Sequence, residues 1–211
     1  MSEQVIRRQQ EMNRSKLRTL VQVGMLGAAA GVLMNFEFPI PVLAPPFYQM
    51  DFSEIPVLVG TFAMGPVAGM LIELIKILLH FVLHGSTTAG VGEFANFVMG
   101  CAFLIPAGMI YRYHHRKTRT HALVGMAAGT ICMTVVACFV NVFVMLPLYG
   151  KAFGMPVEAF VEMGTAVQGV VHNLFTFAVF IIAPFNLFKG IVISVIVTLI
   201  YKRIRVVLRG D

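Results

Sequence analysis

Two polar side chains stand three residues apart inside a very apolar stretch, 184–190, with the sequence PFNLFKG. On a helix Asn186 and Lys189 share one face, and the leading proline suits a first turn. The amide of Asn186 can pair with a lactam- or imide-like edge, and Lys189 can add a charged donor to a carbonyl. Lys189 has no acidic neighbour in sequence, so its partner is Glu93, a loop acid or a ligand carbonyl. We favour the ligand.

A second candidate region is the stretch 35–54, which holds four prolines, several aromatic residues and three acids. Such a loop cannot face lipid, because each unpaired backbone group would cost several kcal/mol there. It therefore caps the protein at the water boundary or lines a cavity. Its aromatic faces and acids suit a flat small molecule with a polar edge, and the alternative is a structural connector. The candidate ligand-binding residues here are Phe36, Phe47, Tyr48 and Asp51.

Two further regions add polar groups to apolar surroundings. Asn141 lies eight residues before Tyr149, and an asparagine in such a run bonds either a neighbouring helix or a ligand. Residues 85–96 begin with small and hydroxyl-bearing residues, and Ser86, Thr87 and Thr88 form a rim suited to a polyol. An acid in the first turn of the following helix complements the helix dipole. The candidates from these regions are Glu93, Asn96, Asn141 and Tyr149.

One apolar segment carries a row of titratable residues. Glu73 and Lys76 are three apart and share a helical face, which favours a structural ion pair over a functional site. His80 and His84 continue that face outward. Their spacing could bind a metal, but no third ligand accompanies them, so we expect an interfacial polar end to the helix and no metal site.

The composition indicates an all-α integral membrane protein in a single membrane domain, 1–211. The mean hydropathy is +0.83, 58% of residues are apolar and 12% are charged, against about a quarter charged in soluble domains. The first 18 residues are polar and basic, unlike a cleavable signal peptide. The three cysteines lie in apolar segments without C-x-x-C spacing and indicate packing rather than metal binding.

The basic residues predict the topology. Apolar segments occupy about 17–35, 52–64, 66–84, 93–113, 121–148 and 184–204, and the basic clusters are 7–18, 112–119 and 202–209. The positive-inside rule places all three clusters, and the 1–16 tail, in the cytoplasm, beside anionic lipid headgroups. Parity then requires the short 52–64 segment to cross as well. We expect six transmembrane helices with both termini cytoplasmic, an outer loop capping a ligand pocket, and 170–183 as an interfacial segment or an outer extension of the last helix.

The basic charge is thus a topology signal, and nucleic acid is not expected as a partner. The sequence contains no G-x-x-x-x-G-K-[ST], H-E-x-x-H or G-x-S-x-G motif, so neither a nucleotide site nor a catalytic residue is expected. Uphill transport would draw its energy from a partner or an ion gradient. Small residues four apart in the first helix form a stripe that packs within the protein or against a partner subunit: Gly24, Gly27, Ala28 and Gly31.

Several motifs in this order resemble a known family. They are FEFPIP at 36–41, DFSEIPVLVG at 51–60, GP at 65–66, ELIK at 73–76, GEFANF at 92–97, LPLY at 146–149 and PFNLFKG at 184–190. They resemble the riboflavin-specific substrate-binding (S) component of energy-coupling factor (ECF) transporters, from the first helix to the end of the last.

The resemblance implies a protein of the prokaryotic cell membrane that captures riboflavin on the outer side, as a transported ligand and not as a cofactor. It implies that the stripe on the first helix meets a transmembrane coupling subunit, which joins two cytoplasmic ATPase subunits. It also implies that Asn186, Lys189 and Asn141 hold the polar edge of the flavin ring.

Three alternatives stay open. The first is an S component for another vitamin, since one fold hosts different pockets. The second is an intramembrane enzyme using Glu73 or His172, which would need two titratable groups at one water-accessible point. The third is a solitary facilitator without ATPase partners.

Overall fold

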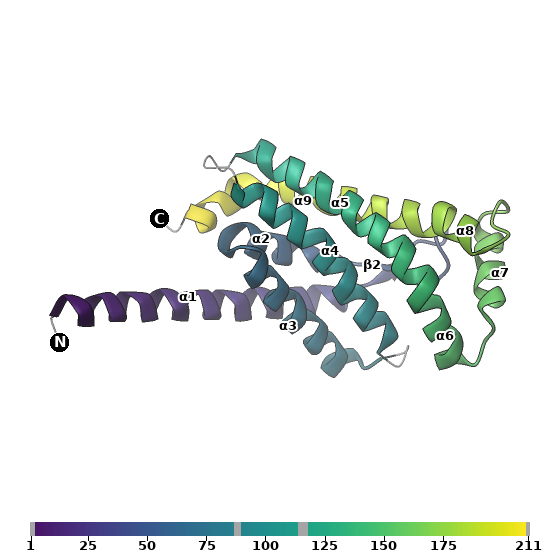
Figure 1. Cartoon of the computed structure of the whole chain (residues 1–211), viewed down its shortest axis with the longest axis horizontal. Coiled ribbons are helices and arrows are strands. Elements are labelled where there is room, and N and C mark those ends of the chain that lie inside the picture. The colour runs from purple at the N-terminus through teal and green to yellow at the C-terminus, as the bar shows by residue number, and fades with distance from the viewer. Residues whose placement is uncertain (1–2, 87–89, 114–117, 210–211) are drawn as a thin grey trace.

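The computed structural model of the chain describes the backbone of residues 3–86, 90–113 and 118–209, and the side chains of 7–86, 90–113 and 118–200. Thr87 and Thr88 of the expected hydroxyl rim lie outside the described residues. The structure is an elongated assembly of helices (Figure 1). Helix α1 (Glu3–Met34) extends well past the other helices at its N-terminal end, and both chain termini lie at the same end of the molecule.

The long helices are those of a multi-pass membrane protein. Among the described residues, five are long and apolar enough to cross a bilayer: Arg7–Met34, Pro66–His84, Val91–Tyr113, Arg119–Phe153 and Leu174–Ile200. Many of their outward side chains are large and apolar, such as Leu78, Phe139 and Leu199, which are 55%, 63% and 70% exposed. Such a surface suits lipid and would be unfavourable in water.

The expected 52–64 segment is the short helix α2 (Glu54–Met64). At about 1.5 Å per residue it spans roughly half of the bilayer core. A hairpin of two short strands precedes it, with β1 (Phe38–Pro39) antiparallel to β2 (Gln49–Met50). Arg112 closes the far end, where its Nη1 donates to the carbonyl of Met64 at 2.7 Å.

The helices α3 (Pro66–His84) and α4 (Val91–Tyr113) match their expected positions within two residues. The expected 121–148 segment consists of α5 (Arg119–Val140), a π-helical turn η1 (Asn141–Met145) and α6 (Leu146–Phe153). Helix α7 (Val157–Val167) follows. Of the two alternatives for 170–183, the structure has an extension of the last helix: α8 (Leu174–Phe177) and the π-helical turn η2 (Ala178–Ile182) lead directly into α9 (Ala183–Arg209). Such π turns often mark functional positions.

The small-residue stripe of α1 divides into two faces. A Cβ on Gly27 would approach the side chain of Ile75 to 2.6 Å, and one on Gly31 would approach Leu79 to 2.9 Å, so these glycines let α1 pack on α3. Gly24 has nothing within 4 Å of such an atom, and Ala28 is exposed. Gly27 and Gly31, expected at a partner interface, therefore pack against α3 of the same chain. Gly24 and Ala28 remain exposed.

Candidate ligand-binding site

A cavity of about 270 Å³ lies where the hairpin loop, residues 35–53, meets α3, α4, η1, α6 and α9; we call this loop the capping loop. Its volume is near the lower end for small-molecule pockets. Of the ten predicted ligand-binding residues, eight line the cavity: Phe47, Tyr48, Glu93, Asn96, Asn141, Tyr149, Asn186 and Lys189. The other two, Phe36 and Asp51, do not.

Two asparagines form one polar wall of the cavity. Asn141 opens η1 and Asn186 lies in α9, and both are at least 94% buried. Each Nδ2 donates to the carbonyl one helical turn earlier, at 2.9 Å to Ala137 and 2.9 Å to Ile182. Tyr48 of the capping loop donates its hydroxyl to Asn141 Oδ1 at 2.9 Å. These bonds fix the orientation of both amides, and each NH₂ group keeps a second N–H for a ligand.

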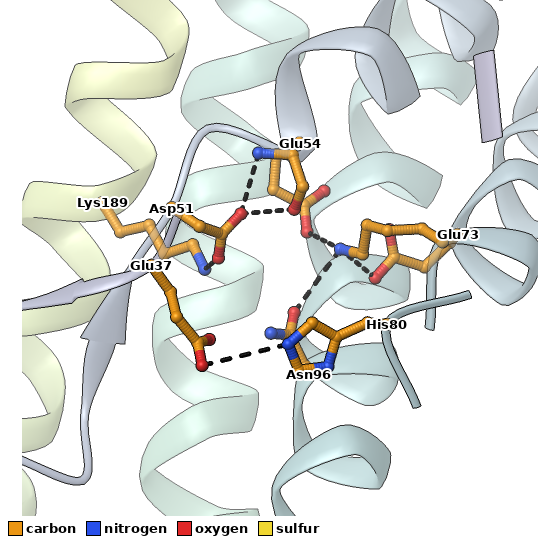
Figure 2. Close-up of polar contacts among 9 residues, drawn as sticks. Glu37, Asp51, Glu54, Glu73, His80, Asn96 and Lys189 are labelled. Carbon is orange, nitrogen blue, oxygen red and sulfur yellow. Dashed lines mark hydrogen bonds and ion pairs between the residues drawn. The ribbon is translucent and has the colours of Figure 1, made fainter. Parts of the chain in front are cut away.

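Lys189 lies beside this wall and is paired with Asp51 of the capping loop. The distance from Nζ to Oδ2 is 2.9 Å, between residues 138 positions apart (Figure 2). Of the three partners considered for Lys189, the structure supplies the loop acid. Asp51 is 1% exposed and also accepts from the Ser53 backbone amide at 2.8 Å. Burial raises its pKa, but the ammonium groups of Lys189 and Lys76 outweigh burial and hold the pKa well below its usual range. Asp51 thus positions Lys189 instead of lining the cavity.

A second buried lysine lies deeper, among carboxylates. Lys76 Nζ is 2.6 Å from Glu73 Oε1 and 2.8 Å from Glu54 Oε1, and it is 3.5 Å from Asn96 Oδ1. All three charged side chains are at most 3% exposed. The expected structural ion pair between Glu73 and Lys76 is therefore confirmed. Glu54, at the start of α2, joins it and ties α2 to α3 (Figure 2).

Two aromatic residues of the capping loop, Phe47 and Tyr48, pack against α7 and α9. Phe47 meets Phe160 of α7 edge to face at 5.6 Å between ring centroids, and Tyr48 lies 5.5 Å from Phe185 of α9. Burial raises the pKa of Tyr48 well above its ordinary value, so the hydroxyl stays a donor to Asn141. Phe36 was also predicted to bind the ligand, but its side chain is 69% exposed and does not line the cavity. Phe36 lies in the turn after α1, and its neighbour Glu37 lines the cavity instead.

The sequence predicts that His80 lies at a polar, interfacial end of its helix, but the structure buries this side chain. It is 5% exposed and lines the cavity beneath the capping loop, where Glu37 Oε1 lies 3.9 Å from its Nε2. His84 lies one turn later on α3 and is exposed. Its ring stacks on that of His80, with 5.3 Å between the ring centroids. Glu73, Lys76 and His80 lie along one helical face, and this pattern indicates that the face is buried. The loop that covers the face could not be placed from the sequence.

The rim of the cavity on the α4 side is polar. Ser86 Oγ donates to Glu93 Oε2 at 2.9 Å and accepts from the Gly90 backbone amide at 2.7 Å. Glu93 is 9% exposed. Within the part of the chain that the structure describes, no group of three or more His, Cys, Asp or Glu side chains could hold a metal ion.

The fold and the cavity define a multi-pass membrane protein with an internal cavity lined by amides, a lysine and aromatic rings. The chain belongs to the family described as "ECF transporter, substrate-specific component", whose model matches residues 18–201. The resemblance recognised from the motifs is confirmed, and membership in a transporter family confirms that the protein is not an enzyme.

Several known proteins are similar to this chain. The riboflavin transporter RibU of Staphylococcus aureus (strain TCH60) is 38% identical over 194 residues, which cover 92% of this chain and 94% of the relative. The riboflavin transporter FmnP of Bacillus subtilis (strain 168) is 33% identical over 191 residues, which cover 90% and 93%. A solved structure of the S component of a bacterial ECF transporter superposes with a TM-score of 0.70 at 36% identity, over 92% of this chain and 98% of that one.

Proposed function

We propose that this chain is the riboflavin-binding S component of an ECF-type vitamin uptake transporter. The observation that carries the proposal is the convergence of Asn141, Asn186 and Lys189 on one wall of an aromatic-capped cavity. The similarity to proteins named riboflavin transporters supports the choice of vitamin.

The chemistry of riboflavin suits this cavity. The flavin is a flat tricycle with an imide-like edge that both donates and accepts hydrogen bonds, which are the complements of an asparagine amide. Lys189 adds a charged donor for a ring carbonyl. The polyol tail is neutral, so no cationic clamp is needed beyond this lysine. Phe47, Tyr48 and Tyr149 supply apolar and aromatic surface for the ring faces.

The topology that goes with this function has both termini in the cytoplasm of a prokaryotic cell. Five long helices alone would leave the termini on opposite sides, so the short α2 completes the sixth crossing with the capping loop above it. The two termini lie at one end of the molecule and the α6–α8 region at the other, which supports this arrangement (Figure 1). The capping loop then faces the outside, where the vitamin is captured.

The partners that we propose are a transmembrane coupling subunit and two ATPase subunits, which hydrolyse the ATP that drives delivery inward. Gly24 and Ala28 are exposed on α1 and present a flat surface to the coupling subunit. Co-purification of the complex tests this assignment. A leucine at position 24 should abolish the co-purification while riboflavin binding persists, and an intact complex would contradict it.

The proposal is tested by the absorbance spectrum of the detergent-purified protein and by a titration that follows riboflavin fluorescence. A co-purified flavin, or quenching that saturates near one ligand per chain, is expected. Asn186→Ala should weaken binding about tenfold, the effect of one or two lost hydrogen bonds. Asn13→Ala, on the exposed N-terminal part of α1, should bind like the wild type. Folded protein without saturable quenching would exclude riboflavin and leave another vitamin as the substrate.

A further inference from the structure

The cavity has a second polar wall, on α3 and the capping loop, which the proposed flavin-ring contacts leave unused. It includes His80, His84, Glu37 and Gln49. Figure 2 shows His80 and Lys189 entering from opposite sides of the close-up, on α3 and α9. A ligand whose ring edge meets Lys189 therefore has a different part available for His80.

His80 is the member of this wall with unused hydrogen-bonding groups. Its side chain is 94% buried, and neither ring nitrogen has a hydrogen-bond partner among the described residues. The nearest carboxylate oxygen, on Glu37, is 3.9 Å away, which is too long for a hydrogen bond. Buried polar groups in folded proteins are nearly always paired, so an unpaired imidazole facing a binding cavity indicates a group that pairs with the ligand.

The neighbours of His80 select the chemistry of that group. Glu37 and Glu93 line the same cavity, and carboxylates disfavour an anionic group such as a phosphate. A metal ion is disfavoured because the described residues offer no set of three ligands. A neutral imidazole has one donor and one acceptor, and a hydroxyl group has both as well. A chain of hydroxyl groups can therefore pair with His80 without adding negative charge beside these carboxylates.

We propose that His80 binds the hydroxyl-bearing chain of the transported ligand and selects for an unphosphorylated polyol. This inference rests on the proposed function, because the flavin ring must occupy the asparagine and lysine wall. The polyol of riboflavin branches from the central ring, away from the imide edge. His80 is thus a specificity-determining residue for the tail, separate from the residues that hold the ring.

The test compares two flavins that share the ring. Riboflavin carries the polyol, and lumiflavin has a methyl group in its place. His80→Phe keeps a flat ring and removes both nitrogens, so the dissociation constant for riboflavin should rise about tenfold while that for lumiflavin changes less than about twofold. His80→Gln keeps a donor and an acceptor and should recover part of the loss. His121→Gln, at the half-buried start of α5 and away from the cavity, is the matched control and should bind both flavins like the wild type.

Retained lumiflavin binding also shows that the variant is folded. If the wild type binds neither flavin, the proposed function fails and the inference fails with it. If the wild type binds riboflavin but both His80 variants keep its preference for riboflavin over lumiflavin, the inference alone is overturned. Flavin mononucleotide separates the remaining chemistry. A greater loss of its binding than of riboflavin binding in His80→Phe would assign His80 to a phosphate and overturn the polyol proposal.

Discussion

Two buried lysines in this protein meet carboxylates in different ways. Lys76 is fully buried, pairs with Glu54 and Glu73, and does not line the cavity. Lys189 is 9% exposed, lines the cavity and pairs with the carboxylate of Asp51 in the capping loop. Both lysines lie inside a membrane protein, where a charge normally suggests function.

The number and origin of the partners separate the two roles. Lys76 is surrounded by two carboxylates from α2 and α3, and a neutral ligand could not replace such partners without leaving negative charge buried. It therefore links helices. Among the described residues, Lys189 pairs with one carboxylate, on a loop that covers the cavity, so a ligand carbonyl can share its donors while Asp51 keeps its bonds from Ser53. Access to the cavity, more than the presence of a charge, distinguishes the ligand-facing lysine.

The largest effect is expected at Lys76. Lys76→Met leaves Glu54 and Glu73 buried without a cation, and breaking such a pair costs about 3–5 kcal/mol. The melting temperature in detergent should fall by roughly 10 °C. Adding Glu73→Gln should recover part of this loss. Lys151→Met, on the exposed face of α6, is the control and should melt like the wild type. A Lys76→Met protein as stable as the wild type would show that Lys76 has no structural role, and the proposed difference between Lys76 and Lys189 would not hold.

A smaller effect on stability but a clear one on binding is expected at Lys189. Lys189→Met should weaken riboflavin binding about 10- to 100-fold, because a charged hydrogen bond to the ring is lost. It should also destabilise the capping loop, since Asp51 loses its counter-ion. The double variant with Asp51→Asn should regain stability but not affinity. Fluorescence titration and thermal unfolding measure the two quantities, and wild-type affinity in the double variant would show that Lys189 does not contact the ligand.

Much of the fold could be predicted because apolar segments and basic clusters are local properties of the sequence. The same local patterns gave the Asn186 and Lys189 face and the ion pair of Glu73 with Lys76. The π-helical turns η1 and η2 were not predicted, because they insert a residue into a helix without a distinctive composition.

The site was harder to predict where it depends on the path of the capping loop. The contact of Asp51 with Lys189 joins residues 138 positions apart, and no local pattern encodes it. The sequence also did not determine which side chains of the loop face inward. It therefore predicted Phe36 as a ligand-binding residue, whereas the structure places Glu37 in the cavity lining. His80 appeared interfacial for the same reason, since the loop that buries it lies about forty residues earlier.

The smallest effect concerns two carboxylates of the capping loop whose pKa values shift in opposite directions. Burial raises the pKa of Glu37, and the nearby charge of Asp51 adds to this. The pKa of Asp51 is lowered, so its contribution to stability is lost only as the pH falls below the ordinary range of an aspartate. Between pH 5 and 8 the contribution of Asp51 is therefore constant.

Glu37 behaves in the opposite way. The folded protein holds its proton more tightly than the unfolded chain does, so stability is gained as the pH falls through the raised pKa and is lost as the pH rises. Glu37→Gln should melt above the wild type at pH 8, by no more than about 2 °C, and the gap should close at pH 5. The effect is small because the Glu37 side chain is 21% exposed, so water screens its charge. A Glu37→Gln protein that melts below the wild type by the same amount at pH 8 and at pH 5 would show that Glu37 is stabilised as a carboxylate, as Asp51 is, and that both acids of the loop serve as counter-ions.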